Sequence, residues 1–157
     1  MHSITYATAG RFAAPEPANV PFDGPGPAAP QRASRLERVM GPAADVGMSE
    51  DCLTLNVWSP GGEGLPVLVF LHGGGFLSGS AGLPWYDGRL LAERGGIVVV
   101  TASYRLGALG YLYVSDEFGP ANLGLLDQTL ALRWVRDHIA GYGGDPANVT
   151  LAGQSAG

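Results

Sequence analysis

Three short apolar runs constrain the fold of this chain more than any other feature. They span residues 67–71, 96–102 and 149–152, are rich in β-branched and aliphatic side chains, and are bounded by turn residues. Short apolar runs without strict alternation are typical of strands that are buried on both faces of a parallel sheet. We therefore expect these three segments to form the centre of such a sheet.

Helical patterns lie between these runs. One covers residues 86–94, and a longer one covers residues 123–140 and places Leu126, Leu130 and Trp134 on one stripe. Strands that alternate with helices form parallel sheets with right-handed crossover connections. The sequence therefore predicts an α/β fold.

The part before residue 67 predicts an antiparallel beginning. Residues 52–58 alternate between apolar and polar side chains, and the glycine-rich residues 61–64 supply a turn, so a hairpin with residues 67–71 is expected. Residues 13–48 are rich in Pro, Ala and Gly and lack a sustained period, which indicates an irregular covering segment with one candidate turn at residues 35–40. The fold class is thus an antiparallel hairpin leading into a mostly parallel sheet with crossover helices, within one partial domain of residues 1–157.

Composition excludes several classes of partner and site. The formal net charge is −5, all nine cationic side chains are Arg, and they form no basic cluster, so a nucleic-acid partner is not expected. The single cysteine, Cys52, cannot form an internal disulfide, which favours a reducing compartment. No apolar run approaches the ~20 residues that span a bilayer, and no signal peptide is visible. We therefore expect no membrane span and favour a cytoplasmic location, with secretion left open.

The pattern G-x-S-x-G closes the chain at residues 153–157, directly after the third apolar run. This is the context of a nucleophile elbow, in which a sharp turn between strand and helix pushes the serine toward substrate. The glycines two residues before and after Ser155 are required because side chains there would clash. So short a pattern also arises by chance in a glycine-rich chain, and other residues must support the assignment.

A second glycine-rich element follows the strand expected at residues 67–71. It reads His72-Gly73-Gly74-Gly75-Phe76 and leaves successive backbone N–H groups free to stabilise a developing negative charge, as an oxyanion hole does. A merely flexible turn is the alternative. A nucleotide site is disfavoured because the chain contains neither G-x-G-x-x-G nor a G-K-[ST] sequence.

Six motifs stand in a fixed order along the chain. They are Glu50-Asp51-Cys52-Leu53, Gly73-Gly74-Gly75-Phe76, Tyr104-Arg105-Leu106-Gly107, residues 122–128, residues 143–146 and residues 153–157. With these motifs the chain resembles the type-B carboxylesterases, the cholinesterase-like family, from about Ile4 to Gly157, and it looks like the first third of a family member. The resemblance implies the α/β-hydrolase fold.

Carried over residue by residue, the resemblance implies an esterase site. Ser155 would be the acylated nucleophile, the N–H groups of Gly74, Gly75 and Ala156 would form the oxyanion hole, and a small-molecule carboxylic ester would be the substrate. Neither a metal nor a cofactor is implied. Gln154 stands where many eukaryotic relatives have Glu, which removes an acidic group from the position before the serine.

The resemblance also implies two structural ion pairs. They would join Arg11 to Glu50 and Arg105 to Asp127, and we expect them to hold loops in place rather than to take part in chemistry. Ala29 stands where many relatives have the disulfide partner of the cysteine at the position of Cys52, so that bridge is not expected.

The expected general base is missing from these residues. In α/β-hydrolases the acid and the histidine follow the serine, whereas His2, His72 and His138 all precede Ser155. We therefore expect a parent protein to hydrolyse carboxylic esters and these 157 residues alone to be almost inactive, with residues 149–152 left as an exposed sheet edge. A non-catalytic binding module of the same fold and a truncated remnant are the alternatives.

Overall fold

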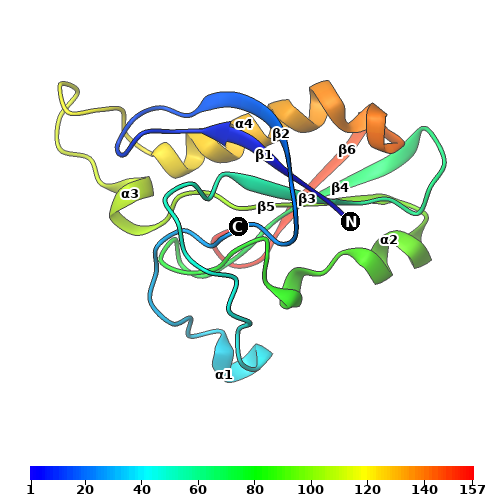
Figure 1. Cartoon of the computed structure of the whole chain (residues 1–157), viewed down its shortest axis with the longest axis horizontal. Coiled ribbons are helices and arrows are strands. Elements are labelled where there is room, and N and C mark those ends of the chain that lie inside the picture. The colour runs from blue at the N-terminus through cyan, green and yellow to red at the C-terminus, as the bar shows by residue number, and fades with distance from the viewer.

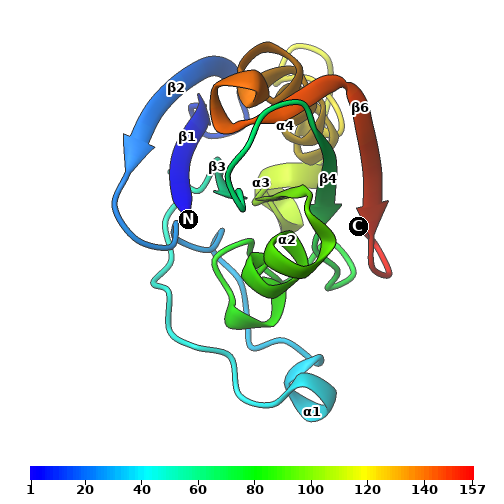
Figure 2. The same ribbon diagram turned by 90° about the vertical axis from the view of Figure 1, so that its right-hand side faces the viewer.

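A computed structural model describes residues 1–157 and contains one six-stranded sheet (Figure 1). The strand order is β2-β1-β3-β5-β4-β6. Along this order β2, β1, β3 and β5 pair antiparallel with one another, whereas β4 is parallel to both β5 and β6. Figure 2 shows β2 and β6 at opposite edges of the sheet. The strands are β1 (His2–Thr8), β2 (Glu16–Phe22), β3 (Thr54–Trp58), β4 (Leu65–Leu71), β5 (Val98–Ala102) and β6 (Gly144–Gly153).

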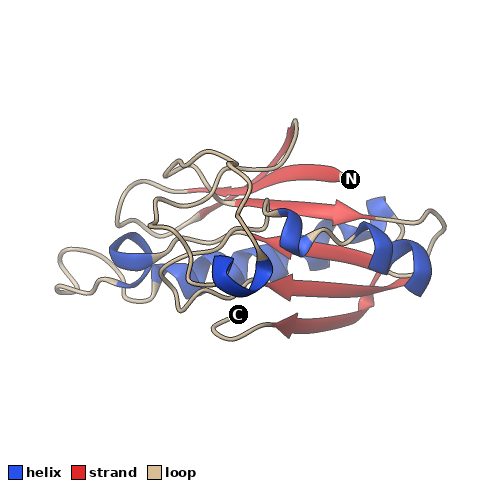
Figure 3. Ribbon diagram, turned by 90° about the horizontal axis from the view of Figure 1, so that it is seen from below, coloured by secondary structure: helices blue, strands red, loops and turns tan.

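Helices cover the two faces of this sheet. Helix α4 packs on one face and α2 on the other, and Figure 3 shows α4 behind the strands when the molecule is seen from below. None of the helices combines the length and apolar character that a bilayer crossing requires. The helices are α1 (Glu37–Met40), α2 (Arg89–Gly95), α3 (Gly107–Tyr111) and α4 (Leu123–His138), with short 3-10 turns at Pro84–Tyr86 and Ile139–Tyr142.

Strand β5 shows how the pleat divides the core between the two faces. All five of its residues are buried. Val98 and Val100 belong to the large cluster beneath α4, whereas Val99 packs with Trp58 and with Ala92 of α2 on the opposite face. Because successive side chains of a strand point to opposite faces, a continuous apolar run is what a strand buried on both faces needs.

The α/β class, with an antiparallel beginning and a parallel part, is confirmed, but the predicted hairpin is wrong. Strand β3 pairs with β1 and β5, and β5 lies between β3 and β4. The turn at residues 59–64 therefore joins strands that are not neighbours. The antiparallel beginning is formed instead by β1 with β2 and β3.

Residues 13–48 are less irregular than expected. Glu16–Phe22 forms strand β2, which pairs antiparallel with β1 and was not expected. Glu37–Met40 forms the single turn of α1 within the candidate turn at residues 35–40. Almost every residue of β2 is exposed, because it is an edge strand whose two faces carry no close-packed layer. Without a buried face there is no alternation for a sequence pattern to detect.

Two further expectations need correction. Leu130 and Trp134 of α4 are buried as predicted, but Leu126 is 37% exposed, and Leu123 and Asp127 continue the buried stripe toward the start of the helix instead. Strand β6 covers residues 149–152 as expected, yet Leu151 is 53% exposed, because β6 has only β4 beside it. The expectation that residues 149–152 are buried on both faces is therefore wrong.

A buried ion pair ties three segments together. Arg105, just after β5, donates from Nε and Nη2 to Asp127 of α4 at 2.9 and 2.7 Å, and the side chains are 4% and 0% exposed. The backbone N–H of Arg105 donates to the same carboxylate at 3.0 Å. Nη1 of Arg105 also donates to the carbonyl oxygen of Ala13 at 2.8 Å. The pair thus fixes the end of β5 against α4 and the loop after β1.

Replacing Asp127 by Asn should destabilise the chain by about 3 kcal/mol or more, because it leaves the buried Arg105 charge without a carboxylate. Urea unfolding monitored by circular dichroism measures this change. The matched control is Asp137→Asn, which breaks the exposed pair between Arg136 and Asp137 and should leave the urea midpoint unchanged. Equal midpoints for the two variants would contradict a structural role for the buried pair.

Candidate active site

Ser155 sits at the tip of a tight turn that follows β6. Its φ angle is +57°, in the left-handed region that residues with a side chain rarely adopt. The turn is held by hydrogen bonds from the Gln154 N–H to the Leu71 carbonyl oxygen at 3.3 Å and from the Gly157 N–H to the Gln154 carbonyl oxygen at 3.0 Å. Ser155 itself is exposed. The turn therefore presents this serine to the outside at the cost of backbone strain.

The glycines on either side of Ser155 are needed for steric reasons. A Cβ on Gly153 would lie 2.5 Å from the carbonyl oxygen of Gly157, and a Cβ on Gly157 would lie 2.8 Å from the carbonyl oxygen of His72. These separations are too short for a side chain, so the turn can close only with glycine at both positions. The spacing G-x-S-x-G is thus explained by this geometry.

The loop after β4 contains the glycines of the expected oxyanion hole. Gly74 and Gly75 have φ angles of +125° and +63°, and the Gly74 carbonyl oxygen accepts hydrogen bonds from the N–H groups of Leu77 and Ser78 at 3.1 and 3.2 Å. The N–H groups of Gly74, Gly75 and Ala156 donate to no group of the chain. The loop therefore keeps these donors free.

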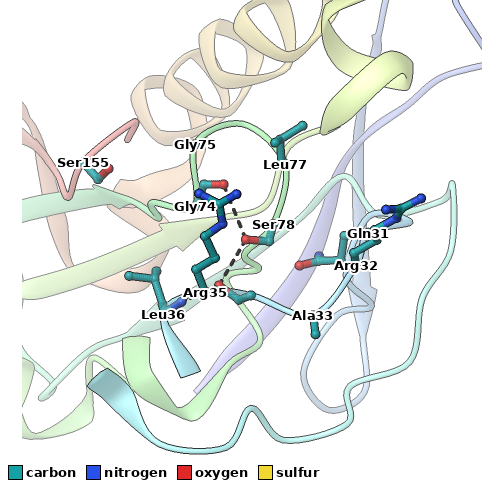
Figure 4. Close-up of a pocket in the computed structure, with 11 residues that line it drawn as sticks. Gln31, Arg32, Ala33, Arg35, Leu36, Gly74, Gly75, Leu77, Ser78 and Ser155 are labelled. Atoms are coloured by element: carbon teal, nitrogen blue, oxygen red, sulfur yellow. Dashed lines mark hydrogen bonds between the residues drawn. The ribbon is translucent and has the colours of Figure 1, made fainter. Parts of the chain in front are cut away.

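One cleft of about 750 Å³ brings the serine and the glycine loop together (Figure 4). Ser155 lies on one side of it, and Gly74 and Gly75 lie on the adjoining wall. Ala156 follows Ser155 in the turn but does not line the cleft. The lining residues are Gln31, Arg32, Ala33, Ser34, Arg35, Leu36, Gly74, Gly75, Leu77, Ser78 and Ser155.

The glycine loop packs directly on the serine turn. A Cβ on Gly73 would lie 2.6 Å from the backbone carbonyl oxygen of Gln154 and would also overlap its side-chain amide. Only glycine permits so close an approach of the two backbones. This contact sets the position of the free N–H groups relative to Ser155.

His72 fixes the start of the loop and makes no hydrogen bond to Ser155. Its ring is buried and stacks on Tyr104 with centroids 4.4 Å apart, and the Tyr104 hydroxyl donates to the His72 carbonyl oxygen at 2.6 Å. Burial lowers the pKa of His72 to about 4, so the ring is neutral at pH 7. Nδ1 lies 2.9 Å from the Gly73 carbonyl oxygen, which makes it the protonated nitrogen. Sequence reasoning placed Tyr104 in one of the six motifs but gave it no role.

The other two histidines also lie elsewhere. His2 on β1 packs edge-on against Tyr142, and His138 at the end of α4 packs against Trp134. None of the three is hydrogen-bonded to Ser155. Within these 157 residues, Ser155 has no imidazole beside it to accept its proton.

Two polar contacts that the sequence did not suggest join the covering segment to the loop. The side-chain amide of Gln31 donates to the Gly79 carbonyl oxygen at 2.8 Å and accepts from the Gly79 N–H at 2.7 Å. The Ser78 hydroxyl donates to the Ser34 hydroxyl at 3.1 Å. The partners are separated by more than forty residues, so spacing along the chain gave no signal of them.

The remaining predicted residues lie away from the cleft. Arg11 and Glu50 are in contact at the surface through a two-bond pair, and Arg11 holds the pKa of Glu50 below its usual value. Burial raises the pKa of Cys52 to about 12, so its thiol is not a ready nucleophile. No group of three or more His, Cys, Asp or Glu residues is placed to hold a metal ion.

Comparison with known proteins places this geometry in a family. The model of the carboxylesterase family matches residues 2–157. The chain belongs to the carboxylesterase family. The prediction made from its six motifs is thereby confirmed.

Individual relatives agree with this assignment. The chain is 51% identical over 166 aligned residues to a probable N-octanoylanthranilate hydrolase of Rhodococcus erythropolis, covering 100% of this chain and 36% of that protein. It is 52% identical over 113 aligned residues to the para-nitrobenzyl esterase of Bacillus subtilis, covering 69% of this chain and 23% of that protein.

A solved structure of a PNB esterase superposes with a TM-score of 0.88 at 46% identity, covering 98% of this chain and 34% of that one. The α/β-hydrolase fold expected from the sequence is therefore confirmed. The chain spans about a third of the length of this esterase and of the Rhodococcus protein.

The buried His72 predicts a loss of stability in acid. The unfolded chain binds a proton at His72 near pH 6.5, whereas the folded chain does so only near pH 4. Between these values the unfolded state holds more protons, so the free energy of unfolding should fall by about 3 kcal/mol as the pH drops through this window.

Urea unfolding at a series of pH values between 7 and 4 measures this effect. His72→Phe keeps an aromatic ring against Tyr104 and should flatten the pH dependence, whereas His138→Asn should leave it intact. An unchanged slope in His72→Phe would show that other groups cause the acid sensitivity.

Proposed function

We propose that the protein to which these residues belong hydrolyses carboxylic esters, with Ser155 as the nucleophile. One observation carries the proposal: an exposed serine on a strained turn shares a cleft with the Gly74 and Gly75 amides, whose N–H groups have no partner in the chain. Carboxylesterase and hydrolase relatives support the same chemistry.

The reaction uses these groups in sequence. The Ser155 oxygen attacks the ester carbonyl carbon as its proton passes to a base, and the carbonyl oxygen becomes an anion. The N–H groups of Gly74, Gly75 and Ala156 donate to that anion. The carbon–oxygen bond to the alcohol then breaks, and the alcohol leaves with the proton from the base. Water next attacks the acyl carbon of the acyl-serine and gives a proton to the base, and the acid leaves as the Ser155 oxygen takes that proton back.

The oxyanion donors supply electrostatic stabilisation without reorganisation. Gly74 and Gly75 are fixed by the turn that closes on the Gly74 carbonyl oxygen, and Gly73 is seated against Gln154. Donors that are already oriented toward developing charge lower the barrier more than water can. In this proposal, their free N–H groups bind the transition state more tightly than the ester.

The base comes from outside these 157 residues in this proposal. His72 is neutral and buried in a contact with Gly73, and neither His2 nor His138 is hydrogen-bonded to Ser155. A serine hydroxyl without a base is a poor nucleophile at neutral pH. The 157 residues alone should therefore show almost no turnover.

A chimeric enzyme tests the proposal. Residues 1–157 replace the matching segment of the Bacillus subtilis para-nitrobenzyl esterase, so that the remainder of that protein supplies what the segment lacks. We expect the chimera to hydrolyse p-nitrophenyl butyrate and to be phosphonylated by a fluorophosphonate at Ser155. Ser155→Ala should lower kcat by about 10⁴-fold or more and abolish labelling. Absorbance of the released p-nitrophenol measures turnover, and peptide mass mapping measures labelling.

The control is the isolated 157-residue chain, which should show neither turnover nor rapid labelling. A folded chimera that remains unlabelled and inactive would contradict the proposal and favour a non-catalytic binding module. Turnover by the isolated chain would show that a base acts on Ser155 from within it.

A further inference from the structure

The wall of the cleft formed by residues 31–36 carries positive charge. Arg32 and Arg35 are the only charged residues among those that line the cleft. Neither takes part in an ion pair, since the three pairs of the chain involve other arginines. The cleft is therefore locally positive in a chain whose formal net charge is −5.

The two arginines differ in direction. Figure 4 shows the Arg35 side chain extending from the covering segment toward the loop of Gly74 and Gly75, on the side where Ser155 lies. The Arg32 side chain points away from Ser155 in the same view. Of the two arginines that line the cleft, Arg35 is therefore the one whose guanidinium extends toward the glycine loop in this view.

Hydrogen bonds hold the turn that carries Arg35 against that loop. The Ser34 hydroxyl accepts a bond from the Ser78 hydroxyl at 3.1 Å and another from the Leu36 N–H at 3.2 Å. The Ser78 hydroxyl also lies 3.4 Å from the Gly74 carbonyl oxygen. The backbone on both sides of Arg35 is therefore fixed relative to the glycine loop, which lowers the entropy lost when Arg35 binds a ligand.

We propose that Arg35 determines specificity and that the cleft takes esters bearing a carboxylate, which Arg35 binds beside the glycine loop. This rests on the proposed ester hydrolysis at Ser155. A guanidinium presents a planar pair of N–H donors that matches the two oxygens of a carboxylate. None of the residues of this chain that line the cleft is acidic, so none of them pairs with Arg35 in place of the substrate.

The carboxylate can belong to either part of an ester, and two pairs of probes separate these sources. Monomethyl glutarate carries it in the acyl part, and dimethyl glutarate is its neutral counterpart. 4-Acetoxybenzoate carries it in the alcohol part, and 4-acetoxybenzamide is its neutral counterpart. Titration of the ¹⁵N-labelled 157-residue chain, followed at the Gly74 and Gly75 amides by NMR, gives the Kd of each probe.

We expect the charged member of at least one pair to bind about fivefold more tightly than its neutral counterpart, and added salt to reduce this preference. The pair that shows the preference identifies the part of the ester that carries the carboxylate. Equal Kd values within both pairs, or no shift at Gly74 and Gly75 with any probe, would overturn the proposal.

Arg35→Gln and Arg32→Gln form a matched pair of variants, since each removes one exposed positive charge from the same wall. The preference should disappear in Arg35→Gln and persist in Arg32→Gln. Equal loss in both variants would mean that the general field of the wall, and not Arg35, attracts the carboxylate, and would overturn the assignment.

Failure of this proposal is distinguishable from failure of ester hydrolysis. Turnover of the neutral p-nitrophenyl butyrate by the chimera does not depend on carboxylate binding. Turnover without any charge preference in the NMR titration would retain the esterase and reject the role of Arg35. A preference in the titration without turnover or labelling would retain carboxylate binding by Arg35 and reject hydrolysis.

Discussion

The parallel pairing of β4 with β6 is the constraint on which the rest of the site depends. Leu71 lies opposite Gly153 in this pairing, so both strands end at the same edge of the sheet. The glycine loop leaves one strand and the serine turn leaves the other. Gly73 then packs against Gln154 without an intervening side chain. Carboxyl ends of neighbouring parallel strands are where α/β proteins place ligands, and here they join a serine to free N–H donors.

The end of β5 supports this arrangement from the next position in the sheet. Tyr104 stacks on His72 and binds its carbonyl oxygen, while Arg105 is anchored by Asp127 of α4. The loops after β4, β5 and β6 thus form one connected structure, in which buried polar contacts hold the backbone and exposed groups remain for chemistry. His72 belongs to the supporting part, since its imidazole is neutral and turned toward Gly73.

Local patterns predicted the parts of the fold whose signal lies within one segment. The apolar run in β5 and the glycines around Ser155 follow from burial on two faces and from steric closure of a turn. The partner of β3 could not be predicted, because a turn does not reveal that β5 is inserted between the strands it joins. Nor could the wall that carries Arg35, because its position depends on the bond between Ser34 and Ser78, far apart in sequence.

In the proposed reaction, the loop after β4 and the turn after β6 together hold an oxyanion. A crystal structure of the chimera phosphonylated at Ser155 tests it most directly, because the phosphoryl oxygen stands in for the oxygen of the tetrahedral intermediate. We expect this oxygen to accept hydrogen bonds from the N–H groups of Gly74, Gly75 and Ala156. A phosphoryl oxygen that points into solvent, away from all three groups, would contradict it.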